Sequence, residues 1–129
     1  MKTQQALLLR KQLSRIAELD QRSPFDLSGS VRLRIAKTLR KCEEVEADFE
    51  KVRNELIRAN GKPDVGGNFN IDRNSPAFQG FVAAIDEMLG SDAEAVPPVA
   101  FTEQDLNVEK NRIPIEVLNG LMAAGVLRD

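Results

Sequence analysis

The sequence predicts a mainly α-helical protein: a helical hairpin with a long heptad-patterned second helix, a small β-hairpin with an edge strand, and two further short helices. Apolar residues recur at helical spacing over most of the chain. Aromatic residues make up only 5% of the sequence, so aliphatic side chains must fill the core, which suits helices. Glycines stand at the ends of the helical patterns, at Gly61, Gly90 and Gly125.

The length and composition are those of one globular domain. The chain has 129 residues, of which 42% are hydrophobic and 29% charged. A chain of this size buries a modest core. We therefore expect a single domain over 1–129, with a helical hairpin at 1–61 and the hairpin loop and C-terminal helices at 62–129.

The first helix is predicted over residues 3–20. Ala6, Leu9, Leu13 and Ile16 follow one another in steps of three and four, which places them on one face. Residues 21–30 contain Pro and Gly and are expected to form a loop. Ser30, at the end of this loop, is a candidate N-cap for the next helix.

The strongest pattern in the chain is a heptad seam over residues 31–60. Its apolar layers include Ile35, Cys42, Phe49 and Leu56, and the pattern stops at Asn60-Gly61. We expect this helix to pack antiparallel along the first helix, with Phe49 in a core layer. A buried cysteine in such a seam is normally inert.

The remaining elements are shorter. A helix is predicted from Ser75-Pro76 to Gly90, because Pro is favoured at the first helical position. Val99 and Phe101 are predicted to form an edge strand after the two prolines. A last helix opens at Ile113-Pro114 and runs to Ala124, and Gly125 ends it.

The segment 64–78, DVGGNFNIDRNSPAF, has polar residues at every second position from Asn68 to Asn74. A calcium loop would need Gly where Arg73 stands and Glu where Gln79 stands. A phosphate-binding loop would need Lys-Ser or Lys-Thr after the two glycines, and the chain has neither there. A hairpin that turns at Gly66-Gly67, with Asp64-Val65 in its first strand, accounts for the pattern better.

The composition argues against an enzyme of the acid–base type. The chain has no His, no Tyr and a single cysteine, Cys42. It therefore lacks the usual general base and the commonest metal ligand, and it has no second cysteine for a disulfide or a thiolate zinc site. We expect no catalytic residue, no cofactor and no metal site.

Charge is divided unevenly along the chain. Residues 1–62 carry 14 Lys and Arg against 9 Asp and Glu, whereas residues 63–129 carry 4 against 11. The basic cluster of the long helix comprises Arg32, Arg34, Lys37, Arg40 and Lys41. It favours phosphate binding without sequence preference, but the acidic block 43–50 follows on the next turns of the same helix.

The adjacent basic and acidic blocks favour a different hypothesis, in which they pair with opposite charges in a second copy laid antiparallel or within the chain itself. In the two-copy arrangement Cys42 lies near the two-fold axis. The predicted interface residues are Ile35, Cys42, Phe49, Arg34, Arg40, Lys41 and Glu44.

The N-terminus has neither the long apolar run of a membrane span nor the pattern of a signal peptide. We therefore expect a protein of the cytoplasm in which it is made, with no membrane partner.

The order of these features resembles a family of small, mostly uncharacterised bacteriophage proteins. The resemblance covers about residues 31–124, and the residues that carry it are Gly61, Asp64, Gly67-Asn68, Ile71, Phe78, Phe81, Val99, Phe101, Ile113 and Leu121. It implies a phage or prophage origin and no catalytic residues, and with it we expect a location in the host cytoplasm or the virion.

Three function hypotheses remain. The first is a non-enzymatic helical interaction module, either a minor assembly component or an accessory factor that binds a host protein. The second is a protein that sequesters a small ligand and blunts host defence, with its pocket between the hairpin at 64–72 and the helices. The third is a non-specific nucleic-acid binder.

Overall fold

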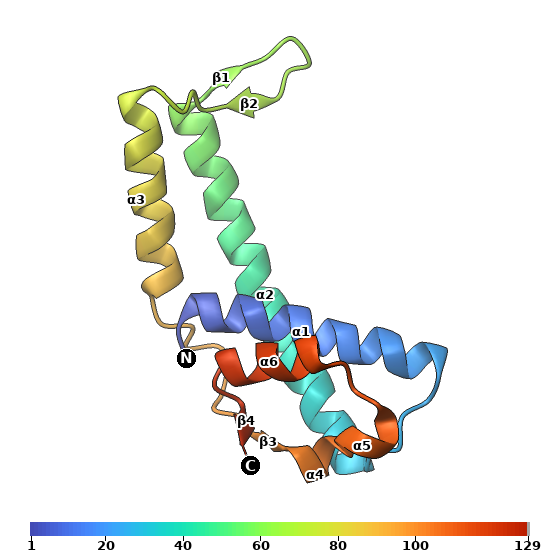
Figure 1. Cartoon of the computed structure of the whole chain (residues 1–129). Coiled ribbons are helices and arrows are strands. Elements are labelled where there is room, and N and C mark those ends of the chain that lie inside the picture. The colour runs from blue at the N-terminus through green and yellow to red at the C-terminus, as the bar shows by residue number, and fades with distance from the viewer. Residues whose placement is uncertain (129) are drawn as a thin grey trace.

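The structure is a computed structural model that describes residues 1–128. It is mainly helical, as predicted, with helices α1 (Thr3–Arg22), α2 (Gly29–Asn60), α3 (Pro76–Gly90), α4 (Glu103–Leu106), α5 (Val108–Asn111) and α6 (Ile115–Ala123). The short strands are β1 (Lys62–Pro63), β2 (Phe69–Asn70), β3 (Phe101–Thr102) and β4 (Leu127–Arg128). In Figure 1, α2 rises out of a group of elements that contains both chain ends, and α3 and the β1–β2 hairpin accompany its upper part.

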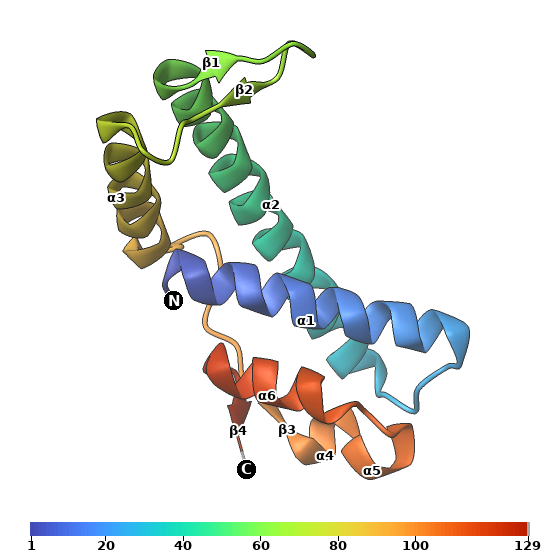
Figure 2. The same ribbon diagram turned by 45° about the horizontal axis from the view of Figure 1, so that its top comes forward.

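Helices α1 and α2 run in opposite directions but cross obliquely (Figure 2). Ion pairs mark the two ends of their contact, between Arg32 and Asp20 and between Arg10 and Glu46. Their contact covers only part of α2, because α2 has 32 residues and α1 has 20. The second half of α2 therefore continues beyond α1.

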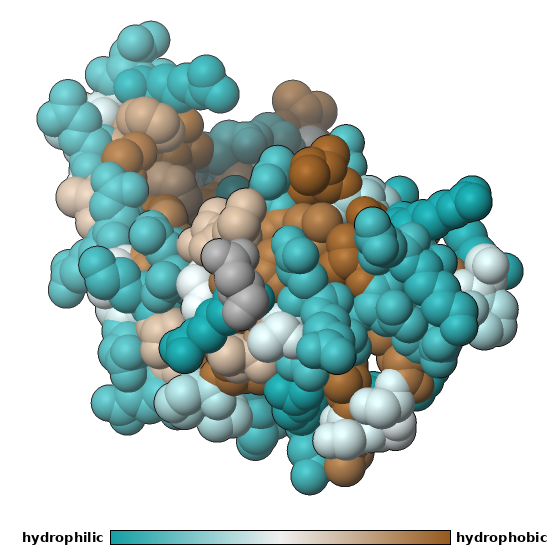
Figure 3. Space-filling model, turned by 60° about the horizontal axis from the view of Figure 1, so that its bottom comes forward, coloured by the Kyte–Doolittle hydropathy of each residue, from teal (hydrophilic) through white to brown (hydrophobic). Residues whose placement is uncertain are grey.

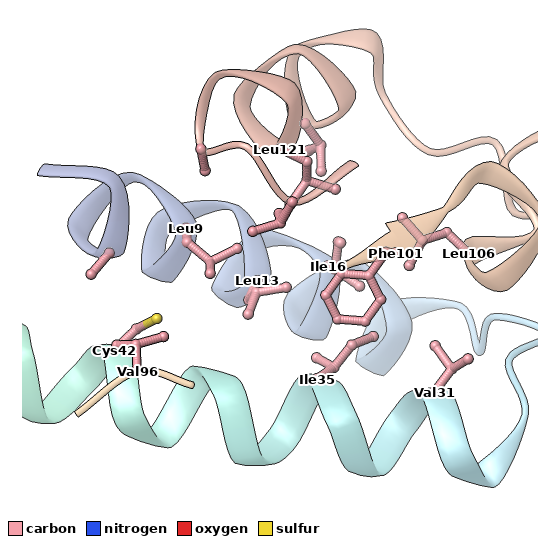
Figure 4. Close-up of a cluster of buried hydrophobic side chains, with 14 of the residues drawn as sticks. Leu9, Leu13, Ile16, Val31, Ile35, Cys42, Val96, Phe101, Leu106 and Leu121 are labelled. Carbon is pink, nitrogen blue, oxygen red and sulfur yellow. The ribbon is translucent and has the colours of Figure 1, made fainter. Parts of the chain in front are cut away.

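The hydrophobic core lies between α1, the first half of α2 and the C-terminal segment (Figure 4). Leu9 and Leu13 of α1 are fully buried, and Cys42 of α2 lies near them. Phe101 and Leu121 close the core from the C-terminal segment. The predicted inward residues Ala6, Leu9, Leu13 and Ile16 are all buried.

Strand β3 pairs with β4, and the pairing is parallel, with Phe101 opposite Leu127 and Thr102 opposite Arg128. The prediction of a strand at Phe101 is confirmed, although Val99 lies outside it. The partner of this strand is the end of the described chain. Leu127–Arg128 is thereby tied back to the core next to α6.

Some predicted boundaries need correction. The cap of α2 is Ser28 and not Ser30, because its Oγ accepts a hydrogen bond of 3.1 Å from the amide of Val31. The predicted helix start at Ser75-Pro76 is confirmed. The last helix begins at Ile115, with Pro114 as its cap, and Gly125 follows it with φ of +77°.

The antiparallel β1–β2 hairpin is smaller than predicted, and its strands consist of different residues. Its paired residues are Lys62 with Asn70 and Pro63 with Phe69, so Asp64 and Val65 belong to the turn. The Asp64 carboxylate accepts hydrogen bonds from the amides of Gly66 and Asn68 and from the side chain of Asn70. Asp64 thus holds the loop closed, as an Asx turn does.

None of the helices in residues 1–128 is long and apolar enough to cross a membrane.

Candidate functional site

The seam of α2 is buried in its first half only. Val31, Ile35, Thr38 and Cys42 are buried, whereas no residue of α2 after Cys42 is. We call residues 43–90, which comprise the second half of α2, the hairpin and α3, the arm. The rest of the described chain is the body. The prediction that Phe49 lies in a core layer is wrong, since Phe49 is half-buried.

Helix α3 gives the arm only partial cover. It packs beside α2, but none of its residues, Pro76–Gly90, is buried. Two helices without a third layer leave part of each apolar face open to water. The arm therefore holds apolar residues that are half-buried or exposed: Val45, Phe49, Val52, Leu56, Phe78, Phe81, Val82, Ile85, Met88 and Leu89.

The most exposed apolar side chain of the arm is Val65 in the hairpin turn, and Phe69 of β2 is also open to water. Val52 of α2 and Val82 of α3 are each 39% exposed. Figure 3 views the molecule from below, and the arm recedes at the back with apolar surface among its hydrophilic side chains. Large apolar side chains left open in this way mark interaction surfaces when they are grouped.

A groove of about 290 Å³ lies at the base of the arm, where α3 meets the body. Val45, Phe49 and Val52 line it from α2, and Met88 lines it from α3. Its rim is acidic, with Asp48, Asp92 and Glu94. The groove is thus an apolar strip with negative charge at its edge.

Charge is also unequal along the arm. The base comprises residues 43–50 and 83–90, which hold seven Asp and Glu and no Lys or Arg. The tip comprises residues 51–75, with five Lys and Arg, among them Arg53 and Arg58, against three Asp and Glu. The base is strongly negative, and the tip is weakly positive.

The residues predicted to form an interface fall into two groups. Ile35 and Cys42 are buried against the rest of this chain, so neither is open to a second copy. Burial raises the pKa of the Cys42 thiol to about 11, with Glu43 adding a smaller repulsion of the thiolate. For residues 31–42 the apolar seam is therefore filled by other parts of this chain.

Arg34 also turns inward. Its guanidinium lies 5.2 Å from the centroid of the Phe101 ring and donates a hydrogen bond of 3.0 Å to the carbonyl of Ala100. It pairs with Asp105 at 3.4 Å. The backbone amide of Thr102 and, secondly, Arg34 hold the pKa of Asp105 below its usual value. Arg34 thus joins α2 to the C-terminal segment.

The remaining predicted residues lie at the surface. Arg40 is exposed, and Lys41 and Glu44 form a solvent-exposed pair at 3.5 Å. Such pairs contribute little to stability. Phe49 and Glu44 are the predicted interface residues that belong to the arm.

The basic cluster of α2 is partly used within the chain. Arg32 pairs with Asp20 and also donates to the carbonyl of Phe25. The hydrogen bond from Arg32 and, secondly, one from the backbone amide of Phe25 lower the pKa of the Asp20 carboxyl. With Arg34 also engaged, Lys37, Arg40 and Lys41 are the cluster members left at the surface. This weakens the case for a phosphate-binding face.

The hairpin provides a second, smaller feature. A cleft of about 280 Å³ lies between the end of α2 and the β1–β2 turn, lined by Asn54, Ile57, Arg58, Gly67, Asn68 and Phe69. Both oxygens of Asp64 are engaged in the turn, and Asp72 accepts a hydrogen bond from the amide of Asn74. Within residues 1–128, no three His, Cys, Asp or Glu side chains gather as a metal site requires.

Sequence reasoning missed the division of α2 into a buried and an open half, because the apolar period is the same in both halves. The two halves could have been distinguished by comparing helix lengths. The apolar pattern at residues 3–20 predicts a first helix that is too short to cover a second helix of 32 residues. In comparisons with known proteins, the chain matches no protein-family model, no curated protein and no solved structure.

Proposed function

We propose that the chain is a non-enzymatic protein-interaction module and that the arm is its contact surface. It would serve as a minor assembly component or as an accessory factor that binds a host protein. One observation carries this proposal. The body closes its own core, with Leu9, Leu13 and Phe101 fully buried, whereas the arm exposes apolar side chains from both of its helices.

The energetic reasoning is simple. Each buried Val, Leu or Phe side chain stabilises a protein by about 1.5–3 kcal/mol relative to full exposure. The arm obtains only part of this stabilisation, because its apolar side chains are only partly buried. A partner that covers Phe49, Val52 and Val82 would supply the rest, and the charged residues around them would form the polar rim typical of interfaces.

The proposed origin is a bacteriophage, and this part of the proposal rests on the order of sequence features over residues 31–124. The arm contains several of those features, including Gly61, Asp64, Phe78 and Phe81. An interaction surface built from this segment agrees with that resemblance.

The experiment is an affinity capture with the tagged full-length chain from phage-infected host lysate. Val52→Asp and Val82→Asp place a charge on the arm at positions that are exposed, so the fold should persist. We expect both variants to lose a partner that the wild type retains. Leu33→Asp is the matched control, because Leu33 is 54% exposed on the half of α2 that belongs to the body. A partner retained by both arm variants would contradict the proposal.

The cleft beside the hairpin favours a second candidate, a protein that sequesters a small anionic ligand. Arg58 supplies a positive charge there, and Asn54 and Asn68 supply amide groups. Thermal-shift measurements with nucleotides would test it. A stabilisation lost in Arg58→Gln would favour sequestration, and no shift with any nucleotide would count against it.

A further inference from the structure

We propose that the arm binds the arm of a second copy of this chain and that the two arms lie antiparallel, so that the tip of each covers the base of the other. This inference rests on the proposed function, since it names the partner of the same surface. The second half of α2 and helix α3 from each copy would together form a four-helix bundle.

The placement of the exposed apolar side chains supports a two-fold axis at the middle of the arm. Val52 lies near the midpoint of residues 43–60, and Val82 lies near the midpoint of α3, Pro76–Gly90. Each is 39% exposed, as is Phe69 of β2 at the tip, which an antiparallel partner would cover with its base. An axis between Val52 and Val82 would bring both side chains, and the half-buried Phe49, into contact with their counterparts. A closed two-fold contact of this kind uses the same patch on both copies.

Charge selects the antiparallel orientation. In a parallel pair, the two bases would lie side by side, each with seven acidic residues and no basic one. In an antiparallel pair, each base faces a tip that contains Lys51 and Arg58, and also Arg53, which pairs with Glu50 of its own chain at 3.8 Å. Exposed charges of this kind contribute little affinity, but they decide between orientations.

The size of the surface fits a reversible dimer. Eighteen helical residues span about 27 Å, and two helices side by side are about 20 Å wide. Such a face covers roughly 500 Å² per copy, or roughly 1,000 Å² in total, which is at the low end of specific interfaces. The groove at the base, with its acidic rim, would then receive the partner's tip.

This arrangement differs from a dimer centred on Cys42. That side chain is fully buried in the body beneath α1, so a pairing through it would require the body to open. The proposed axis instead lies near Val52, about ten residues or about 15 Å beyond Cys42 along α2.

The first experiment measures the mass of the full-length chain by sedimentation equilibrium over a range of concentrations. We expect a reversible rise from the 14.3 kDa of one chain to twice that value. Val52→Asp and Val82→Asp should each weaken dimerisation at least tenfold. Leu33→Asp, the control on the body, should leave it unchanged. A monomer at every concentration, or equal weakening by Leu33→Asp, would overturn the inference.

The second experiment determines orientation with single cysteines in a Cys42→Ala background and a short bifunctional maleimide. Val52→Cys, near the axis, should crosslink to its own copy, and Ala59→Cys, at the tip, should not. When Glu44→Cys and Arg58→Cys chains are mixed, we expect the mixed crosslink to dominate. Self-crosslinking at Ala59→Cys without the mixed product would establish a parallel pair and overturn the antiparallel assignment.

These outcomes separate the two proposals. A chain that is monomeric, yet loses a captured host or virion protein in Val52→Asp, would overturn the self-pairing and keep the interaction module. A dimer that dissociates in Val52→Asp, with no other protein captured, supports the self-pairing.

Discussion

Gly61 lies so close to Asn70 that a Cβ atom on it would be 2.8 Å from the Asn70 carbonyl oxygen and 2.6 Å from the carbonyl oxygen of Ile57. Both oxygens belong to the backbone, which cannot rotate out of the way as a side chain can. The hairpin therefore packs onto the end of α2 through the missing side chain of Gly61.

This contact predicts that Gly61→Ala destabilises the tip of the arm by about 1–3 kcal/mol, the usual cost of an overpacked site. Hydrogen exchange of the hairpin amides would measure the loss locally. Gly80→Ala is the matched control, because a Cβ there meets nothing within 4 Å and Gly80 lies inside α3. It should stabilise α3 by up to about 1 kcal/mol. Equal effects of the two substitutions would contradict the packing described for Gly61.

The division of the chain into body and arm predicts unequal costs for truncating an apolar side chain in each. Leu13→Ala empties a fully buried position in the body and should lower the free energy of unfolding by about 2–5 kcal/mol. Phe49→Ala removes a half-buried ring and should cost less, about 1–2 kcal/mol in the monomer. Urea unfolding at low protein concentration would compare them. If Phe49→Ala costs as much as Leu13→Ala, Phe49 is fully buried in the monomer, which would contradict the open arm of the structure.

Asp105 predicts a dependence of stability on pH. Its carboxylate accepts from the amide of Thr102 at 3.0 Å and pairs with Arg34, so its folded-state pKa is below the unfolded value of 3.8. The stabilisation is therefore present above pH 3.8 and is lost as the pH falls through the lower folded-state pKa. Asp105→Asn should cost about 1 kcal/mol at pH 7, after allowance for its partial exposure.

Thermal unfolding from pH 7 down into the acid range would test this. The difference between wild type and Asp105→Asn should shrink to nothing once the wild-type carboxylate is protonated. Glu103→Gln, an exposed change in the same turn, should stay within about 0.5 kcal/mol of wild type throughout. A difference for Asp105→Asn that is constant with pH would show that the charge is not the cause.

Cys42 is predicted to be unreactive in the folded chain. The thiol is fully buried and burial raises its pKa to about 11, so very little thiolate exists at pH 8. A thiol reagent should therefore react only as fast as the body opens, and it should react at once in denaturant. Mild oxidation should produce no Cys42–Cys42 dimer. Rapid labelling of the native protein would place Cys42 at the surface.

Local patterns predicted most of the helices correctly, because each depends on residues close in sequence. The spacing of Ala6, Leu9, Leu13 and Ile16 identified the buried face of α1, and Ser75-Pro76 identified the start of α3. Helices α4 and α5 escaped prediction because four residues are too few to show a period. The β3–β4 pair escaped because its two strands are 26 residues apart, between Phe101 and Leu127.

The candidate site was predicted only in part. The heptad pattern identifies the apolar side of α2, but it cannot say whether another element covers that side. Cys42 and Phe49 occupy equivalent heptad positions, yet one is buried by α1 and the other is half-open. The contact of Arg34 with Phe101 could not be predicted for a related reason, because Phe101 is distant from Arg34 in sequence.

The continuity of α2 has a mechanical consequence. From Ser30 to Asn60 the helix contains neither Pro nor Gly, the usual causes of a kink, so it is a stiff rod of about 48 Å over its 32 residues. A sideways force on the tip would not be absorbed by a hinge. It would be carried as torque to the point where α2 is clamped by α1 and by the contact of Arg34 with the C-terminal segment. The chain thus behaves as a lever, and a force that a bound partner exerts on the arm is transmitted to the buried side chains around Ile35 and Cys42.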